Sequence, residues 1–295
     1  SSKPNNIVIR DSNVMDECIL LESQLPPFMK DYFIYLRGAV AVTTRRAYLN
    51  DIKFFCNYII ESGLYTNAEN LSDISLDDFS EISARDINIF LGDYCNRYYK
   101  EVNSDRILYE NNNKSLARKK SSISTLFKFL YRNGQLKDDI TGGFNPIKLP
   151  KPQPDAIKRL EIDEVATKER DYWLKTKLRD KAILVLFVTY GLRLNELREL
   201  NISSFNFSRG EFMIYRKRGK EVLMPINQAC EKVVKDYIEY ERPKSSDIGE
   251  EDQDALFLSL QKKRMTARSI RDLVKKYTSI AMKTTRDKGY SPHKL

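Results

Sequence analysis

The sequence predicts a mainly α-helical protein with a small antiparallel β-sheet, organised as two domains. Apolar residues recur at helical spacing through the first half of the chain. Residues 203–226 instead alternate short apolar stretches with turn residues, as strands do. Between residues 141 and 154 lie two glycines and four prolines, so no helix continues there. We therefore assign an N-terminal region to residues 1–145, a linker to 146–158 and a second domain to 159–295.

The N-terminal region is expected to be a helical bundle that begins at about residue 27. Its apolar stripes are Tyr48, Ile52, Phe55 and Ile59, then Ile87, Phe90, Leu91 and Tyr94, then Ile123, Leu126, Phe127 and Leu130. Ser83 followed by Asp86 resembles a capping pair that opens the second of these helices. We assign the stripes to the hydrophobic core and give them no binding role.

One helix of this bundle is strongly basic. Between Asn111 and Lys137 there is no carboxylate, although ordinary solvated helices mix both signs of charge. The side chains that would meet phosphates are Lys114, Arg118, Lys119, Lys120 and Ser121. The alternative is a helix face that only contributes solubility.

A second basic turn lies earlier in the bundle. Thr43 and Thr44 are candidate helix caps, and Arg45 and Arg46 follow them in the first turn. We expect Thr44, Arg45 and Arg46 to contact phosphates as well.

In the second domain, residues 203–226 predict short strands with turns at 208–210 and 218–219. Helices are expected to resume at 228–241 and at 266–282, with Thr266 as the N-cap of the latter.

The composition of the chain restricts the classes of binding partner that we expect. Lysine and arginine number 50 against 41 acidic residues, which gives a formal charge of +9 and indicates nucleic acid or an anionic membrane. The longest apolar stretch, residues 182–190, is too short to span a bilayer, so we expect no membrane partner. Four cysteines without paired spacing fit a reducing cytoplasm, and a single histidine makes a metal site improbable.

The most informative residues are Gly191, Leu192 and Arg193, which follow an apolar run of helical length. Glycine is the usual residue just past a helix end. Arg193 would then stand at the start of the next helix, where a guanidinium suits a phosphate-like anion. The alternative is an ordinary surface pair with Glu196 at helical spacing.

This block resembles the first signature of the tyrosine recombinases, the Xer and integrase enzymes that cut and rejoin DNA. Residues 215–226 look like the β-hairpin that carries their catalytic lysine. The sequence Ser-Pro-His-Lys-Leu at 291–295 looks like the opening of their second signature. The three segments stand in the family's order, and the resemblance extends from about Pro27 to the C-terminus. It implies a helical core-binding domain followed by an α+β catalytic domain.

The resemblance also implies roles. Arg193 would stabilise the negative charge that develops on the non-bridging oxygens of the scissile phosphate, and Glu196 would orient Arg193. Lys217 would be the general acid that protonates the leaving 5′ oxygen, with Lys220 as the competing candidate. His293 would hydrogen-bond the same phosphate, unless it is only structural. Further DNA contacts are expected from Arg216, Arg218 and Lys220.

The implied reaction is site-specific recombination through a 3′-phosphotyrosine intermediate, in a mobile element or in Xer-type resolution. It needs no cofactor and no metal, and its partners would be double-stranded DNA with a specific site and a homo-tetramer on two such sites. The family's second arginine and nucleophilic tyrosine would follow His293 and are not assigned, so we expect this chain to bind DNA without completing cleavage. The alternatives are a DNA-binding regulator, a degenerate recombinase, a type IB topoisomerase or a telomere resolvase.

Overall fold

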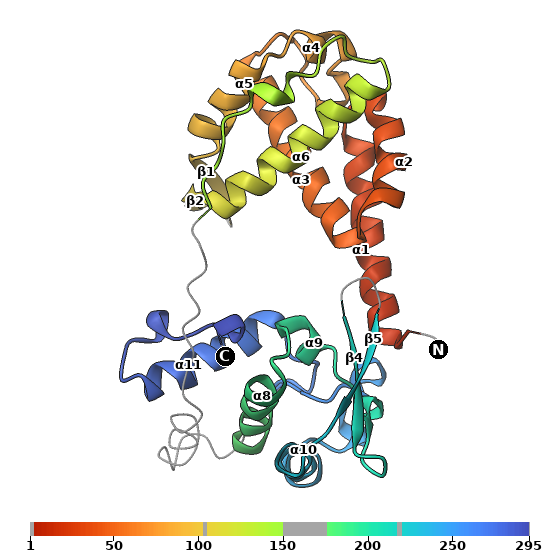
Figure 1. Cartoon of the computed structure of the whole chain (residues 1–295), viewed down its shortest axis with the longest axis vertical. Helices are drawn as coiled ribbons and strands as arrows, with labels where there is room; N and C mark the ends of the chain where they lie inside the picture. Colours follow the sequence, from red (N-terminus) through yellow and green to blue (C-terminus); the bar gives the residue numbers. More distant parts are fainter. Residues whose placement is uncertain (1–2, 103–104, 150–175, 217–219, 295) are drawn as a thin grey trace. The chain divides into compact units, whose positions relative to one another are not determined.

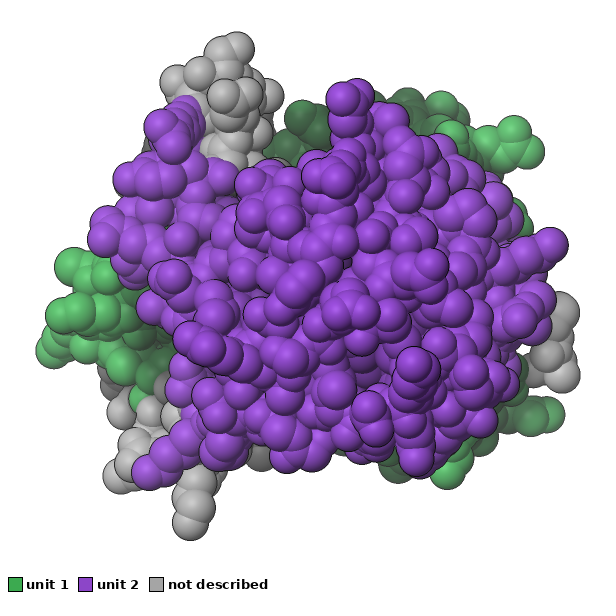
Figure 2. Space-filling model, turned by 90° about the horizontal axis from the view of Figure 1, so that it is seen from above, with its two compact units in different colours: residues 1–7, 153–295 green, residues 8–152 purple. Residues whose placement is uncertain are grey.

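The computed structural model describes residues 3–102, 105–149, 176–216 and 220–294. The chain divides into two compact units, one of residues 8–152 and one of residues 1–7 with 153–295, which Figure 2 colours separately. The described residues are mainly helical and carry small antiparallel sheets, which confirms the predicted fold class. Each unit has its own hydrophobic core.

The unit of residues 8–152 is a helical bundle with one β-hairpin (Figure 1). Helix α1 spans Asn5–Gln24, and its residues from Val8 onward belong to this unit. The remaining elements are α2 (Lys30–Ala39), α3 (Val42–Ser62), α4 (Leu76–Ser80), α5 (Ala84–Ile89), a π-helical turn η3 (Phe90–Tyr94), β1 (Arg97–Val102), β2 (Asp105–Glu110) and α6 (Asn113–Arg132).

Aromatic rings fill the centre of this bundle. Phe55 of α3 lies edge-on to Phe90, with ring centroids 4.9 Å apart, and Phe79 of α4 stacks on Phe127 of α6 at 5.6 Å. All four rings are buried, so α3, α4, η3 and α6 meet around them. The three predicted apolar stripes therefore face the core, apart from half-buried Tyr48 and Tyr94 at its edge.

Helix starts in this bundle follow the sequence signals only in part. Ser83 and Asp86 form the expected capping box at the start of α5. Helix α3, however, begins at Val42 with Ala41 in the N-cap position, so Thr43 and Thr44 lie inside its first turn. The capping role expected of these threonines is therefore wrong.

The hairpin β1–β2 was not foreseen. Its strands pair in antiparallel register with Tyr98 opposite Tyr109, whose rings stack with centroids 5.7 Å apart. Tyr98 also contacts the ring of Phe54 at 4.9 Å, which ties the hairpin to α3. Tyrosine and branched residues favour strands, and here that local preference overrides the helical character of the surrounding chain.

The described part of the other unit combines helices with a three-stranded antiparallel sheet of order β3-β4-β5 (Figure 1). Its described helices and strands are α8 (Lys177–Tyr190), α9 (Leu194–Arg198), β3 (Phe205–Asn206), β4 (Glu211–Tyr215), β5 (Glu221–Pro225), α10 (Gln228–Tyr240) and α11 (Ala267–Ala281). Two short 3-10 turns follow, η9 (Arg286–Lys288) and η10 (Pro292–Lys294).

The predicted strands and helices of this unit are present. Thr266 caps α11 as expected, because its hydroxyl accepts the backbone N–H of Ser269 at 3.1 Å. The core joins apolar residues of α8, α9, β4, α10 and α11 in one cluster. No helix in the described part of the chain is long and apolar enough to cross a bilayer.

Gly191 terminates α8 in the left-handed conformation, with φ +58°, and its N–H donates to the carbonyl of Phe187 at 2.9 Å. A side chain at this backbone angle is strained even though a Cβ would meet no atom within 4 Å. The turn that leads into Arg193 therefore depends on glycine.

Gly191→Ala is expected to lower the free energy of unfolding by about 1 kcal/mol. Gly249→Ala is the matched control, because Gly249 has φ −58° and equally open surroundings. Urea unfolding followed by circular dichroism measures both. Equal midpoints for the two variants would show that backbone strain does not operate at Gly191.

Candidate functional site

Arg193 is held by a single buried carboxylate. It occupies the N-cap position of α9, and Glu196 lies one turn later with a side chain 5% exposed. Glu196 Oε2 accepts the backbone N–H of Arg193 at 2.9 Å, and Oε1 accepts its Nη1 at 2.9 Å. The arginine side chain nevertheless stays 66% exposed. Glu196 thus fixes both ends of Arg193 while leaving guanidinium donors open to an anion.

A second guanidinium approaches the same carboxylate from the sheet. Arg216 follows β4, and its Nε lies 3.8 Å from Glu196 Oε1. Its backbone N–H donates to the carbonyl of Lys220 at 2.8 Å, which closes the base of the β4–β5 turn. Two cations around one carboxylate leave a net positive charge, as a phosphate-binding site requires.

Lys217 and Arg218 lie outside the described residues. Lys220, which directly precedes β5, is exposed. At the end of β4, burial and then the nearby Glu221 raise the pKa of Tyr215 above its ordinary value.

His293 is exposed in η10, and Pro292 before it is buried. The turns η9 and η10 both pack on α11, which also packs on α9. Leu273 and Val274 of α11 share the core cluster with Leu194 and Leu197 of α9. Arg193 and His293 are therefore supported by the same helix.

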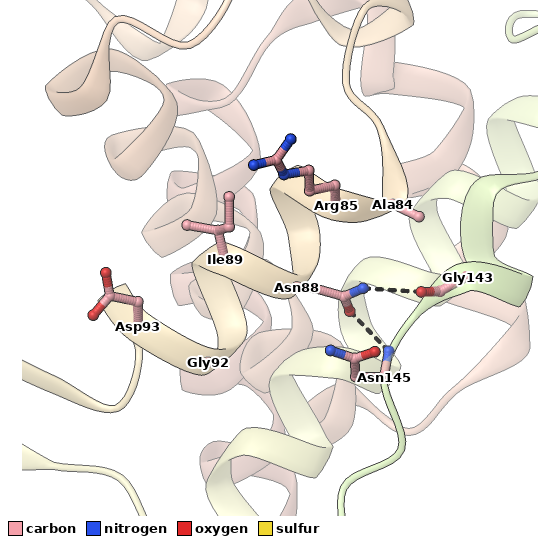
Figure 3. Close-up of a pocket in the computed structure, with 8 residues that line it drawn as sticks. All are labelled: Ala84, Arg85, Asn88, Ile89, Gly92, Asp93, Gly143 and Asn145. Carbon is pink, nitrogen blue, oxygen red and sulfur yellow. Dashed lines mark hydrogen bonds between the residues drawn. The ribbon is translucent and has the colours of Figure 1, made fainter.

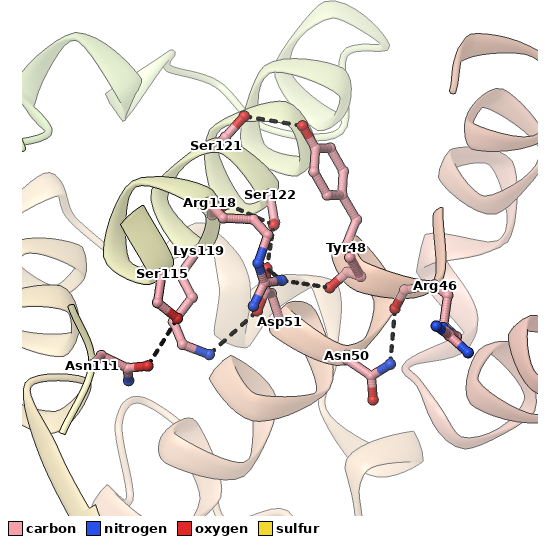
Figure 4. A network of polar contacts seen from close by, with 11 residues as sticks. Arg46, Tyr48, Asn50, Asp51, Asn111, Ser115, Arg118, Lys119, Ser121 and Ser122 are labelled. Atoms are coloured by element: carbon pink, nitrogen blue, oxygen red, sulfur yellow. Dashed lines mark hydrogen bonds and ion pairs between the residues drawn. The ribbon is translucent and has the colours of Figure 1, made fainter. Parts of the chain in front are cut away.

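The basic helix α6 is less free than its sequence suggests, because α3 supplies it with a carboxylate (Figure 4). Asp51 is 2% exposed and accepts Arg118 Nη1, Lys119 Nζ at 3.3 Å and the Ser122 hydroxyl at 2.7 Å. Lys119 is buried and also lies over the ring of Phe54, with its Nζ 4.3 Å from the centroid. The phosphate contact expected of Lys119 does not fit this burial. Arg118 remains 42% exposed.

The basic turn at the start of α3 shows the same pattern. Arg45 is buried, and its guanidinium is held by Glu22 of α1. Arg46 is half-exposed and pairs with Glu17 at 2.7 Å. The phosphate contact expected of Arg45 does not fit its burial either, and Thr44 is only half-exposed.

Three of the expected contacts remain on or near the surface of α6. Lys114 is exposed. Lys120 is half-buried, and its Nζ donates to the carbonyls of Phe144 and Asn145 at 3.2 and 2.8 Å. Ser121 is exposed, with its hydroxyl 3.0 Å from that of Tyr48 (Figure 4).

Comparison with known proteins identifies the chain. Residues 159–295 match the Phage integrase family. The tyrosine recombinase XerC of Natranaerobius thermophilus is 31% identical over 234 residues, a match that covers 78% of this chain and 73% of that protein. The XerC of Caldanaerobacter subterraneus subsp. tengcongensis is 27% identical over 285 residues, covering 92% of this chain and 73% of that protein. The chain belongs to the phage integrase family of tyrosine recombinases.

Solved structures share the fold of this recombinase. XerH site-specific recombinase bound to difH substrate, in a pre-cleavage complex, has a TM-score of 0.63 at 19% identity and covers 96% of this chain and 76% of its own. The integrase of transposon Tn1549, in complex with circular intermediate DNA, has a TM-score of 0.55 at 15% identity and covers 94% of this chain and 82% of its own. Family membership makes the protein a site-specific recombinase that acts on DNA.

Sequence reasoning missed Asp51 in the recombinase. Its signal was present, because Asp51 stands three residues after Tyr48 and four before Phe55, on the apolar side of a helix. A carboxylate at such a position needs a buried cationic partner. Only the structure shows that the partners lie on α6, 67 and 68 residues along the chain.

A surface hollow of about 560 Å³ lies in the unit of residues 8–152 (Figure 3). Within it, Asn88 donates to the Gly143 carbonyl at 2.9 Å and accepts the Asn145 N–H at 2.7 Å. The Asn88 amide is thus already engaged by the backbone, and we assign the hollow no ligand.

Arg193→Ala is expected to reduce DNA cleavage by about 10² to 10³ and to leave DNA affinity almost unchanged, because the role expected of its charge is to stabilise the transition state. The assay follows cleavage of duplex DNA by the whole recombinase. Glu196→Gln should reduce cleavage in the same direction by releasing Arg193. Arg209→Ala is the matched control, since this exposed arginine has only a 3.9 Å pair with Glu211. Parallel loss of binding and cleavage in Arg193→Ala would contradict the assignment.

Proposed function

We propose that this recombinase cleaves and rejoins duplex DNA at a specific site, with Arg193, Lys217 and His293 acting on the scissile phosphate. The observation that carries the proposal is the buried Glu196 carboxylate, which pins Arg193 from two directions and leaves its guanidinium exposed. An arginine so preorganised needs little reorganisation when charge develops on a phosphate oxygen. A simple surface pair would not require burial of the acid.

The chemistry assigns each group a task. A tyrosine hydroxyl attacks phosphorus, the 3′-phosphotyrosine bond forms, and the bond to the 5′ oxygen breaks. Arg193 binds a non-bridging oxygen, and His293 donates a hydrogen bond to the same phosphate. Lys217 protonates the departing 5′ oxygen. The phosphotyrosine link conserves the energy of the broken bond, so the reaction requires neither a nucleotide nor a metal ion.

For the unit of residues 8–152, we propose a core-binding role in which the exposed cations of α3 and α6 contact phosphates. The cations are Arg46, Lys114, Arg118 and half-buried Lys120, and the exposed hydroxyl of Ser121 would contact phosphate beside them. Arg118 is supported by its bond to buried Asp51, which holds its guanidinium while part of it stays exposed. Arg216 and Lys220 are proposed phosphate contacts beside the hairpin.

At the level of assembly, we propose a homo-tetramer that joins two DNA sites in the cytoplasm and exchanges strands in pairs. Integration or excision of a mobile element and Xer-type resolution both fit this reaction.

Trapping of a covalent protein–DNA adduct distinguishes a recombinase from a non-catalytic DNA-binding protein. The whole recombinase should give a covalent adduct with suicide DNA, whereas a binder gives none. Supercoil relaxation without synapsis would indicate a topoisomerase instead.

Lys217→Ala should abolish cleavage of ordinary DNA and recover it on DNA with a 5′-bridging phosphorothiolate, whose thiolate leaves without a proton. The measurement is the cleavage rate on both substrates, with Lys220→Ala as the matched variant. Rescue confined to Lys220→Ala would transfer the general-acid role to Lys220.

Lys114→Gln should flatten the salt dependence of binding to duplex DNA by up to about one unit in the slope of log K against log [salt]. Lys119→Gln is the contrasting variant: it should leave the slope unchanged, because Lys119 is buried against Asp51. Fluorescence anisotropy over a salt series measures both slopes. A reduced slope for Lys119→Gln alone would contradict the assignment of Lys114, and not Lys119, as a phosphate contact.

A further inference from the structure

The chain between η9 and His293 is pressed against the C-terminal half of α11. Gly289 and Tyr290 both contact α11 there. These contacts involve backbone groups of the segment, so they fix its path rather than the side chains it presents. His293 follows three residues after the second contact.

Gly289 is required for space and not for its backbone angle, since its φ is −60°. A Cβ at this position would overlap the carbonyl oxygen of Lys275 and lie 2.8 Å from the carbonyl carbon. These atoms belong to the backbone of α11 and cannot rotate away. Any side chain at position 289 must therefore push the segment off the helix.

Thr278 supplies the second contact from within α11. Its side chain is 2% exposed, and its hydroxyl accepts the backbone N–H of Tyr290 at 2.8 Å. The same hydroxyl donates to the carbonyl of Val274 at 2.7 Å. One hydroxyl thus joins the helix to the segment, and valine, which has a similar shape, would remove both hydrogen bonds.

The apolar face of α11 supports Arg193. Ile270, Leu273 and Val274 pack in one cluster with Leu194 and Leu197, which belong to the short helix α9 that Arg193 caps. Neither α9 nor η10 is long enough to be stable alone, so their geometry depends on this packing. If the chain between η9 and His293 moves along α11, His293 therefore moves relative to Arg193.

We infer that Gly289 and Thr278 are positioning residues, which fix His293 against α11 so that it and Arg193 address the same phosphate. The inference rests on the proposed role of His293 for its functional consequence. The anchoring itself is a property of the DNA-free chain and is tested without DNA.

The first experiment uses the chain labelled with ¹⁵N-histidine. Because His293 is the single histidine, its backbone amide gives the only signal. In the wild type this amide should be rigid, with an order parameter of about 0.85, and in Gly289→Ala and Thr278→Val it should fall below about 0.6. Thr278→Ser keeps the hydroxyl and should restore the wild-type value. Gly249→Ala, in open space, is the control for an added methyl group.

Unchanged order in both Gly289→Ala and Thr278→Val would overturn the inference. If one of the two fails to fold, the other still decides, together with its serine counterpart in the case of Thr278. Equal loss of order in Thr278→Ser and Thr278→Val would also overturn it, because the hydroxyl would then play no part.

The second experiment measures DNA cleavage by the whole recombinase. A displacement near 1 Å at a catalytic group costs about a hundredfold in rate, so Gly289→Ala and Thr278→Val should lose about that factor at unchanged DNA affinity. Thr278→Ser should cleave like the wild type. If His293→Ala cleaves normally, the proposed role of His293 fails while the anchoring stands. If His293→Ala is inactive but the anchor variants cleave normally, the positioning inference fails alone.

Discussion

The arrangement of the unit of residues 1–7 and 153–295 depends on the buried carboxylate of Glu196. A buried charge is tolerated only when it is paired and hydrogen-bonded, so the two oxygens of Glu196 need the partners that they find. The backbone and guanidinium of Arg193 donate two hydrogen bonds, and Arg216 adds an ion pair at 3.8 Å. Because these partners come from the start of α9 and the end of β4, one carboxylate links the two elements. The buried carboxylate of Glu196 thus sets the orientation of both guanidiniums, although parts of them remain exposed to solvent.

Buried carboxylates also hold cations in the unit of residues 8–152. Asp51 lies under α6 and neutralises Lys119 while holding Arg118 at the surface. Glu22 does the same for Arg45. The number of basic residues therefore overstates the cations available to DNA, because some of them are paired with carboxylates inside the bundle. Among the described residues, the cations that stay exposed include Lys114, Arg118 and half-exposed Arg46, whose partner Glu17 is itself 55% exposed.

Features set by neighbours in sequence could be predicted, and features set by distant contacts could not. The apolar stripes each lie within twelve consecutive residues. The capping box at Ser83, the cap at Thr266 and the left-handed end at Gly191 each depend on at most five consecutive residues. Burial of Lys119 depends instead on α3, and the start of α3 at Val42 places both threonines inside the helix. The β1–β2 hairpin depends on Tyr98 reaching Phe54, a contact that helical periodicity around it conceals.

The proposed catalytic residues stand on short elements, which explains why their geometry needs support from elsewhere. Arg193 caps a five-residue helix and His293 lies in a three-residue turn. Elements of this length have no stability of their own in water. Glu196 holds Arg193 from within the same helical turn, so the spacing of the two residues in the sequence predicts this support. His293 has no such local partner among the described residues, and its segment is instead fitted to α11 through the missing side chain of Gly289 and the hydroxyl of Thr278. Recognition of a catalytic motif therefore identifies the groups that react, whereas the residues that aim them are found only by the contacts they make.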